Sequence, residues 1–242
     1  MAAASDLAAM GATPLAALAA WVLPRESTED DVAALARGQK IACDALGAPV
    51  VGGNLARGPA LSIATTWIGS TGSGTPPIAR SGARPGGGLF VCGDLGLASA
   101  GFHALSGGLD TPAAAAEAFR SPVARIAAGL RMATVAHAAL DVSDGLAIDA
   151  GRLAAASGVR VVLDEVALRN HLHSATIAVA CALGKDPLEL ALAGGEDYAL
   201  LCASPREIEG FVRVGAIESG EGCVLRGAAG DRPVTGGFDH FA

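Results

Sequence analysis

Apolar residues recur along the chain in two alternating patterns, one typical of strands and one typical of helices. Short continuous runs of apolar or β-branched residues, bounded by proline or glycine, indicate strands. Segments with apolar residues three or four positions apart indicate helices with one buried face. The runs predict strands over 15–23, 50–51, 61–68, 89–92, 135–140, 159–163, 199–202 and 212–225. The periodic segments predict helices over 3–10, 29–46, 97–105, 113–120, 122–129, 146–153 and 175–183, with a further helix from Pro205.

The order of these elements, in which strands and helices alternate, indicates a mixed α/β protein of the α+β class. Residues 70–88 are rich in glycine, serine, proline and threonine, which is typical of a boundary between structural units. We therefore expect two parts, an N-terminal domain over residues 1–84 and a C-terminal α+β domain over residues 85–242.

The composition limits the classes of function open to the chain. The formal net charge is −7 and no basic residues cluster, which argues against a nucleic acid partner. Proline or glycine interrupts the apolar runs well short of the ~20 residues of a membrane helix, so we expect no membrane association. The five cysteines form no Cys-x-x-Cys pair and the first positive charge is Arg25, a pattern that favours a cytoplasmic protein without a signal peptide.

Two carboxylates and a hydroxyl lie together where the predicted strand 135–140 meets the next helix. Asp141, Ser143 and Asp144 follow the apolar run, and Gly145 permits a tight turn. A pair of carboxylates suits Mg²⁺, which prefers oxygen ligands together with water and phosphate oxygens. Asp144 also stands just before a helix, where a carboxylate stabilises the free N–H groups. From these residues alone, metal binding and helix capping both stay open.

A second motif, Gly-Gly-Glu-Asp-Tyr at residues 194–198, favours the first interpretation. Together with Asp-Val-Ser-Asp-Gly-Leu at residues 141–146, it resembles the thiamine-monophosphate kinase family, which belongs to the superfamily of aminoimidazole ribonucleotide synthetase and selenophosphate synthetase. The resemblance extends from Ser5 to Phe241. The further segments that carry it are Ser-Asp-Leu-Ala-Ala-Met-Gly-Ala at 5–12, Val-Gly-Gly-Asn at 51–54, Arg-Gly-Pro at 57–59, Arg-Ser-Gly-Ala-Arg-Pro-Gly at 80–86 and Gly-Phe-Asp-His-Phe at 237–241.

The resemblance implies a two-domain synthetase-like fold in which ATP and thiamine monophosphate meet between the domains. Several Mg²⁺ ions would be held by Asp6, Asn54, Asp141 and Asp144. Asn54 stands where the family usually has aspartate, and because asparagine lacks the charge we expect weaker Mg²⁺ binding there. For Asp6 without the resemblance, a helix cap or a solvated helix face is the simpler interpretation.

The same resemblance implies which residues contact ATP. Gly53, Asn54, Arg80 and Ser143 would do so, since glycine lets backbone N–H groups approach a phosphate and arginine offers a fixed fork of donors. The structural alternatives are an ordinary turn at Gly53 and an exposed loop arginine at Arg80.

Thiamine monophosphate would be contacted by Glu196, which can pair with the pyrimidine amino group, and by Phe238 through packing. Phe241 is a second candidate for that packing, and a core role is the alternative for both aromatic residues. We expect Asp197 and Tyr198 to support the loop.

The resemblance implies an ATP-dependent kinase that converts thiamine monophosphate to thiamine diphosphate without a covalent nucleophile. The alternative is a truncated or degenerate paralogue that binds a nucleotide or another protein. Asn54 favours this alternative. So does the lack, in this sequence, of a segment that the family carries ahead of Ser5 and that holds metal-binding residues and dimer strands. We therefore expect an incomplete N-terminal domain and a homodimer weaker than in the family. A synthetase with another substrate is a third possibility, against which residues 194–198 argue.

Overall fold

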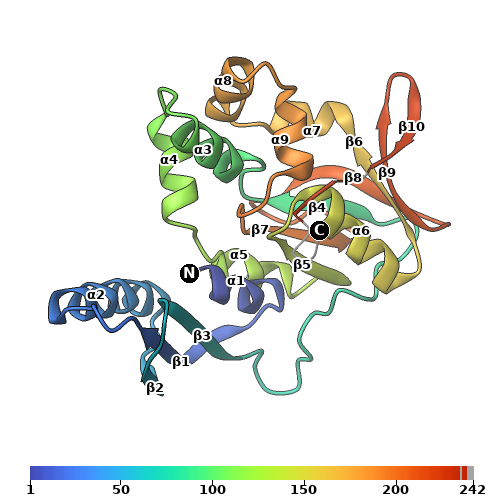
Figure 1. The fold of residues 1–242 in the computed structure, drawn as a ribbon. Helices are drawn as coiled ribbons and strands as arrows, with labels where there is room; N and C mark the ends of the chain where they lie inside the picture. Colours follow the sequence, from blue (N-terminus) through green and yellow to red (C-terminus); the bar gives the residue numbers. More distant parts are fainter. Residues whose placement is uncertain (235, 239–242) are drawn as a thin grey trace.

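The chain folds into two β-sheets joined by a linker, with helices packed around them (Figure 1). The computed structural model describes residues 1–234 and 236–238. The strands of the smaller sheet lie within residues 13–70 and those of the larger sheet within residues 88–233. The mixed α/β class predicted from the sequence is thereby confirmed. The domain boundary at residue 84 falls in the linker and stays a prediction.

The smaller sheet has the strand order β2-β1-β3. β1 (Thr13–Leu23) runs parallel to β2 (Val50–Arg57) and antiparallel to β3 (Ser62–Ser70). Helix α2 (Glu29–Leu46) makes the crossover between the two parallel strands. Such a connection is needed because a short turn cannot join parallel strands.

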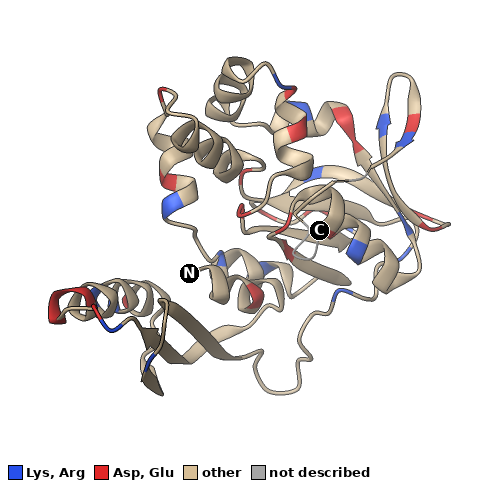
Figure 2. Ribbon diagram, viewed as in Figure 1, with Lys and Arg blue, Asp and Glu red and all other residues tan. Residues whose placement is uncertain are grey.

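The ends of α2 follow the signals in its sequence. Thr28 and Asp31 form a capping box at its start, and Gly47 ends it in the left-handed conformation at φ 64°. The acidic first turn, which complements the helix dipole, is the red end of α2 in Figure 2.

One prediction about this sheet is wrong. The sequence pattern ends a strand at residue 51, whereas β2 continues through Gly52 and Gly53 to Arg57. A Cβ atom on Gly53 would lie 1.8 Å from the carbonyl oxygen of Ala19 on β1. Glycine at this position therefore lets the two strands approach, and the pair does not form a loop.

The larger sheet has the strand order β10-β9-β6-β8-β4-β7-β5. Adjacent strands in this sheet are antiparallel, except that β6 and β9 run parallel. The strands are β4 (Gly88–Cys92), β5 (Ala138–Val142), β6 (Arg160–Asp164), β7 (Ala199–Ser204), β8 (Val212–Glu218), β9 (Gly222–Gly227) and β10 (Gly230–Pro233).

Both faces of this sheet are covered, and the side chains of its central strands alternate between two cores (Figure 1). Leu140 and Leu201 belong to the core beneath α6 (Leu146–Ser157) and α9 (Pro187–Ala193). The opposite core packs against α1 (Ala2–Ala9) and α5 (Ile126–Met132), and is formed by Ala8, Phe90, Met132, Leu200 and Cys202, among others.

A satellite core joins α3 (Leu97–Ser106), α4 (Ala113–Arg120) and α8 (Ser174–Ala182). The closest approach in it is at Gly101 of α3, where a Cβ atom would lie 2.0 Å from the carbonyl oxygen of Ala115 on α4. The absent side chain thus sets how near the two helices can pack.

Several predicted elements differ from the observed ones. The helix expected from Pro205 is wrong, because the Ser204 hydroxyl bonds to both backbone groups of Arg206 and closes a local turn instead. Helix α5 begins at Ile126, four residues after its predicted start at 122. Two short helices were not predicted, α7 (Glu165–His171) and α9, which are capped by Asp164 and Asp186 respectively. No helix in the described ranges is long and apolar enough to cross a bilayer.

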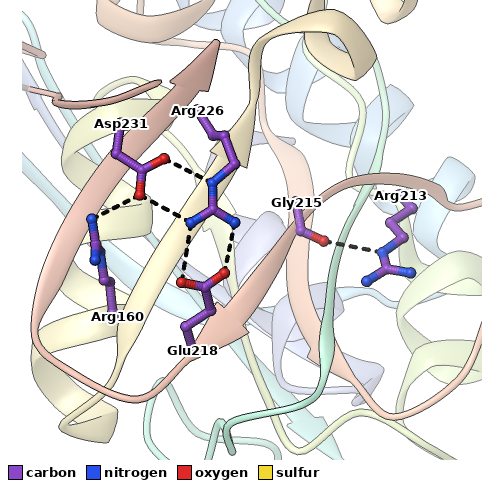
Figure 3. A network of polar contacts seen from close by, with 6 residues as sticks. All are labelled: Arg160, Arg213, Gly215, Glu218, Arg226 and Asp231. Atoms are coloured by element: carbon purple, nitrogen blue, oxygen red, sulfur yellow. Dashed lines mark hydrogen bonds and ion pairs between the residues drawn. The ribbon is translucent and has the colours of Figure 1, made fainter. Parts of the chain in front are cut away.

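The β9–β10 hairpin, also not predicted as separate strands, is tied to its neighbours by an ion-pair network (Figure 3). Arg226 on β9 bonds Asp231 on β10 through Nε at 2.7 Å and Glu218 on β8 through Nη1 at 2.7 Å. Arg160 on β6 donates to the same Asp231 at 2.9 Å. The network is partly exposed, so its contribution is chiefly to fix the hairpin against the sheet edge.

The α3–α4 contact yields a testable expectation. Gly101→Ala should lower the free energy of unfolding by about 1–3 kcal/mol, because the added methyl group meets the Ala115 backbone. The control is Gly151→Ala in α6, where nothing lies within 4 Å of the added atom. That substitution should stabilise the protein by about 0.5–1 kcal/mol, since alanine favours a helix. Urea unfolding measures both, and equal effects would show that the contact is not tight.

Candidate active site

The first loop of the candidate site, residues 143–145, follows directly on strand β5. β5 extends through Asp141 to Val142, whereas the sequence pattern ends the strand at residue 140. Asp141 pairs with Leu200 of β7 and faces the same side of the sheet as that residue, toward α1. Burial raises the pKa of Asp141; nearby Ser5 opposes the rise and the charge of Asp6 adds to it. The structure thus brings Asp6 and Asp141 together from α1 and β5.

A buried carboxylate holds the turn that follows. Asp149 is only 2% exposed, and its Oδ2 accepts hydrogen bonds from the backbone N–H groups of Ser143 at 3.0 Å and Asp144 at 3.1 Å. Arg152 donates to the other oxygen of Asp149 at 2.7 Å and to Asp144 at 2.5 Å. Asp149 was not assigned a role from the sequence, although an aspartate in the first helical turn after such a motif is a signal that could have indicated one.

Helix capping by Asp144, the alternative left open by the sequence, is wrong. The N-cap residue of α6 is Gly145, at φ 121°, and no side chain caps the helix. The Asp144 carboxylate instead forms an ion pair with Arg152 within α6. The Asp144 carboxylate therefore lies beside the turn, held by Arg152, and does not cap the helix.

The second loop, residues 194–198, is bonded to the first along the backbone. The N–H group of Glu196 donates to the carbonyl oxygen of Ser143 at 2.8 Å, and that of Tyr198 to Val142 at 2.8 Å. Glu196 and Tyr198 have φ values of 69° and 48°, in the left-handed region that non-glycine residues rarely adopt. Because such strain persists only where the surroundings enforce it, the loop conformation is fixed by these bonds.

Side chains of the second loop extend this order. The Tyr198 hydroxyl donates to Glu196 at 3.1 Å, which orients the Glu196 carboxylate. Asp197 accepts from the backbone N–H groups of Gly96 at 2.6 Å and Ala98 at 3.2 Å, at the start of α3. The predicted supporting role of Asp197 and Tyr198 is confirmed by these contacts.

Both loops open onto one cavity of about 490 Å³. Asp144 and Glu196 lie on its wall, and the backbone N–H group of Phe238 donates to the Asp144 carbonyl oxygen at 2.9 Å, which fixes Phe238 at the rim. Phe241, the other predicted aromatic contact, lies outside the described residues. The cavity is lined by Ala98, Ser99, Phe102, Phe119, Ser143, Asp144, Gly195, Glu196, Tyr198 and Phe238.

Comparison with known proteins identifies the family. A family model for the N-terminal domain of AIR synthase related proteins matches residues 1–71, and one for their C-terminal domain matches residues 84–221. Thiamine-monophosphate kinase of Mycobacterium tuberculosis is 35% identical over 224 residues, which cover 92% of this chain and 67% of that protein. The same enzyme of Pyrococcus abyssi is 32% identical over 98% of this chain and 76% of its own length.

Structural comparison agrees. The solved structure "AaThiL complexed with AMPPCP and TMP" matches with a TM-score of 0.89 at 32% identity, over 98% of this chain and 77% of that one. The chain belongs to the thiamine-monophosphate kinase family. The resemblance found in the sequence is confirmed, and this is a family of phosphotransferases.

The metal ligands implied for the family are only partly brought together. Within residues 1–234 and 236–238, no three His, Cys, Asp or Glu side chains are arranged to hold a metal ion. Asp6 lies near enough to Asp141 for its charge to add to the rise that burial causes in the pKa of Asp141. Burial raises the pKa of Tyr198 and the charges of Asp141 and Asp144 add to that rise, so these two carboxylates lie near its hydroxyl group. Their donors are all carboxylate oxygens, the kind that Mg²⁺ prefers.

Three of the four residues predicted to contact ATP lie apart from the cavity. Gly53 and Asn54 line a separate groove between α2 and the smaller sheet. Arg80 is in the linker, where its carbonyl oxygen accepts from Ser157 at the C-terminal end of α6. Because α6 has 12 residues, about 18 Å of helix separates that contact from the turn at Asp144. The ATP contacts assigned to these residues in the family stay predictions.

The hydrogen bonds that Asp149 accepts can be tested by measuring the free energy of unfolding. Asp149→Ala should lower the free energy of unfolding by about 3 kcal/mol, because two N–H groups and Arg152 lose a buried partner. Asp164→Ala, which removes an exposed helix cap on α7, should cost only about 1 kcal/mol. Urea unfolding measures both. Similar losses would mean that Asp149 does not organise the turn.

The pKa shifts predict opposite pH dependences for two aspartates. The pKa of Asp141 is raised by burial, so its ionisation destabilises the fold as the pH rises above about 3.9. Asp141→Asn should therefore be more stable than the natural protein at pH 7, with the difference vanishing at lower pH.

Hydrogen bonds from Arg169 lower the pKa of Asp186 to about 2, so Asp186→Asn should be less stable at pH 7 and lose that difference on acidification toward pH 2. Unfolding curves across this pH range check both signs; a destabilised Asp141→Asn protein at pH 7 would contradict the first.

Proposed function

We propose that the chain transfers the γ-phosphoryl group of ATP to thiamine monophosphate, giving thiamine diphosphate and ADP. The observation that carries this proposal is the cavity onto which both family motifs open, with Ser143 and Asp144 on one loop and Glu196 on the other. Its relative AaThiL was solved with AMPPCP and TMP together, which supports a site for a nucleotide and a thiamine phosphate.

The reaction joins two anionic phosphates, so the site must bring them close against their repulsion. This transfer requires no covalent nucleophile on the protein, so the rate enhancement would come from positioning and electrostatics. Ser143 offers a hydroxyl to a phosphate oxygen, on a turn whose backbone Asp149 fixes. The bonds between the two loops hold that hydroxyl at a set position relative to Glu196.

We propose Asp6, Asp141 and Asp144 as the residues that would hold Mg²⁺. Bound there, the ions would neutralise phosphate charge and align the two substrates. Within the described residues the three carboxylates do not converge on one point, so phosphate oxygens and water would have to complete the coordination; the fit rests on the carboxylate oxygens and on the closeness of Asp6 to Asp141. Arg152 limits the freedom of Asp144 and so keeps its carboxylate beside the turn.

Thiamine monophosphate is assigned to the cavity itself. Glu196 faces it with a carboxylate that can accept a hydrogen bond from the pyrimidine amino group, and Tyr198 orients that carboxylate. Phe238, held at the rim by its backbone bond to Asp144, packs against the ligand.

A homodimer also belongs to the proposal. The smaller sheet leaves several large apolar side chains exposed to solvent, which a partner subunit would cover. They are Leu15, Leu18, Val50, Val51, Leu55, Ile63 and Ile68. Gly53 and Asn54 lie on this same sheet, and a nucleotide that contacts them would have to reach beyond the described cavity.

A second candidate is a chain that binds ATP without turning it over. Asn54 favours it, because it replaces the charged ligand usual in the family with a neutral amide. Calorimetric titration with ATP, with and without Mg²⁺, separates binding from catalysis. Mg²⁺-dependent binding without ADP release would support this second candidate.

The kinase activity is tested by coupled detection of ADP release. Release should require both thiamine monophosphate and Mg²⁺, and Asp144→Asn should lower kcat/KM by about 100-fold or more. The control is Asp164→Asn at the N-cap of α7, which does not line the cavity and should leave kcat/KM unchanged. ADP release that is independent of thiamine monophosphate would refute the proposal.

A further inference from the structure

The cavity has an aromatic wall that neither motif provides. Phe102 of α3 and Phe119 of α4 lie with ring centroids 5.5 Å apart and ring planes inclined by 56°. With Phe238 at the rim, three of the six phenylalanines of the chain line this one cavity. In a protein so poor in aromatic residues, this grouping indicates a surface built for a ring-shaped ligand.

The wall is placed by the packing of its helices. Gly101 allows α3 and α4 to approach closely, and its neighbour Phe102 then meets Phe119 across the contact. Phe102 nevertheless stays 45% exposed, because its ring faces the cavity and not a core. A side chain of this size that is held in position but uncovered is available to a ligand.

Another part of the cavity lining is polar and anionic. It consists of the Ser143–Asp144 turn and the Glu196 carboxylate, joined by the backbone bond from Glu196 to Ser143. The cavity is therefore lined by both aromatic rings and carboxylates. Both attract a cationic ring, since the face of an aromatic ring carries negative charge density.

We infer that Phe102 and Phe119 determine specificity for the positively charged thiazolium ring of thiamine monophosphate. The inference rests on the proposed function and names the residues that select the substrate. An uncharged heterocycle of the same shape would gain only apolar contact from the two rings. The thiazolium ring gains in addition the attraction of its charge to their faces.

The test compares two ligands on the full chain by isothermal titration calorimetry. One is thiamine monophosphate and the other is deazathiamine monophosphate, in which an uncharged thiophene ring replaces the thiazolium ring. Phe102→Leu and Phe119→Leu should each raise the Kd of thiamine monophosphate roughly 3- to 30-fold. They should raise the Kd of the deaza compound by a clearly smaller factor and leave that of ATP unchanged.

Two controls separate this effect from loss of structure. Phe102→Tyr keeps a π face and should keep the affinity within about twofold. Phe211→Leu, which alters a phenylalanine packed against the core beneath α1 and α5, should change neither Kd.

The possible outcomes are distinct. Equal losses for both ligands would overturn the inference, because the wall would then be merely apolar. A loss of ATP affinity would overturn it in favour of an adenine site. Tight binding of thiamine monophosphate that neither leucine variant changes would overturn the inference while leaving the proposed function intact. A natural chain that binds ATP but no thiamine monophosphate would refute the proposed function and the inference with it.

Discussion

The site depends on two backbone hydrogen bonds, from Glu196 to Ser143 and from Tyr198 to Val142. They join loops that stand more than fifty positions apart in the sequence, and they continue the pairing of β5 with β7 past the end of both strands. Only with these bonds in place can two non-glycine residues keep left-handed backbone angles. The same loop fixes the start of α3 through Asp197, so the polar wall and the aromatic wall of the cavity are set by one segment.

The acidic character of the site is sustained by a balance of charge. Asp149 is buried, yet it accepts two backbone hydrogen bonds and one from Arg152, which satisfy its oxygens. Burial raises the pKa of both carboxyls; the Asp144 backbone and Arg152 oppose the rise at Asp149, whereas at Asp141 Ser5 opposes it and the charge of Asp6 adds to it. One buried aspartate thus builds the turn, and another retains an unfavourable charge that a cation would stabilise.

Small residues carry much of the packing that positions these groups. A Cβ atom on Gly129 of α5 would lie 2.1 Å from the carbonyl oxygen of Ala8, so α1 sits close against α5 and Asp6 is brought toward β5. Gly101 plays the same part between α3 and α4 and thereby sets the aromatic wall. In both places the absent side chain, and not a large one, determines where the candidate site residue lies.

The sequence by itself determined the class of fold, most strands and helices, and the two motifs, because periodicity, caps and motif spacing are local properties. Its signals were sufficient at α2, where Thr28 and Gly47 mark both ends. They left helix capping by Asp144 open, and the structure excludes it, because that carboxylate pairs with Arg152. They were wrong at Gly53, which continues β2 and packs closely against Ala19 of β1. Only the tertiary structure decided that Phe102 and Phe119 share a cavity with Glu196, and that Asn54 and Arg80 lie apart from it. The reason is physical: these relations depend on contacts between segments distant in the chain, and no periodicity within a segment encodes which distant surface it will meet.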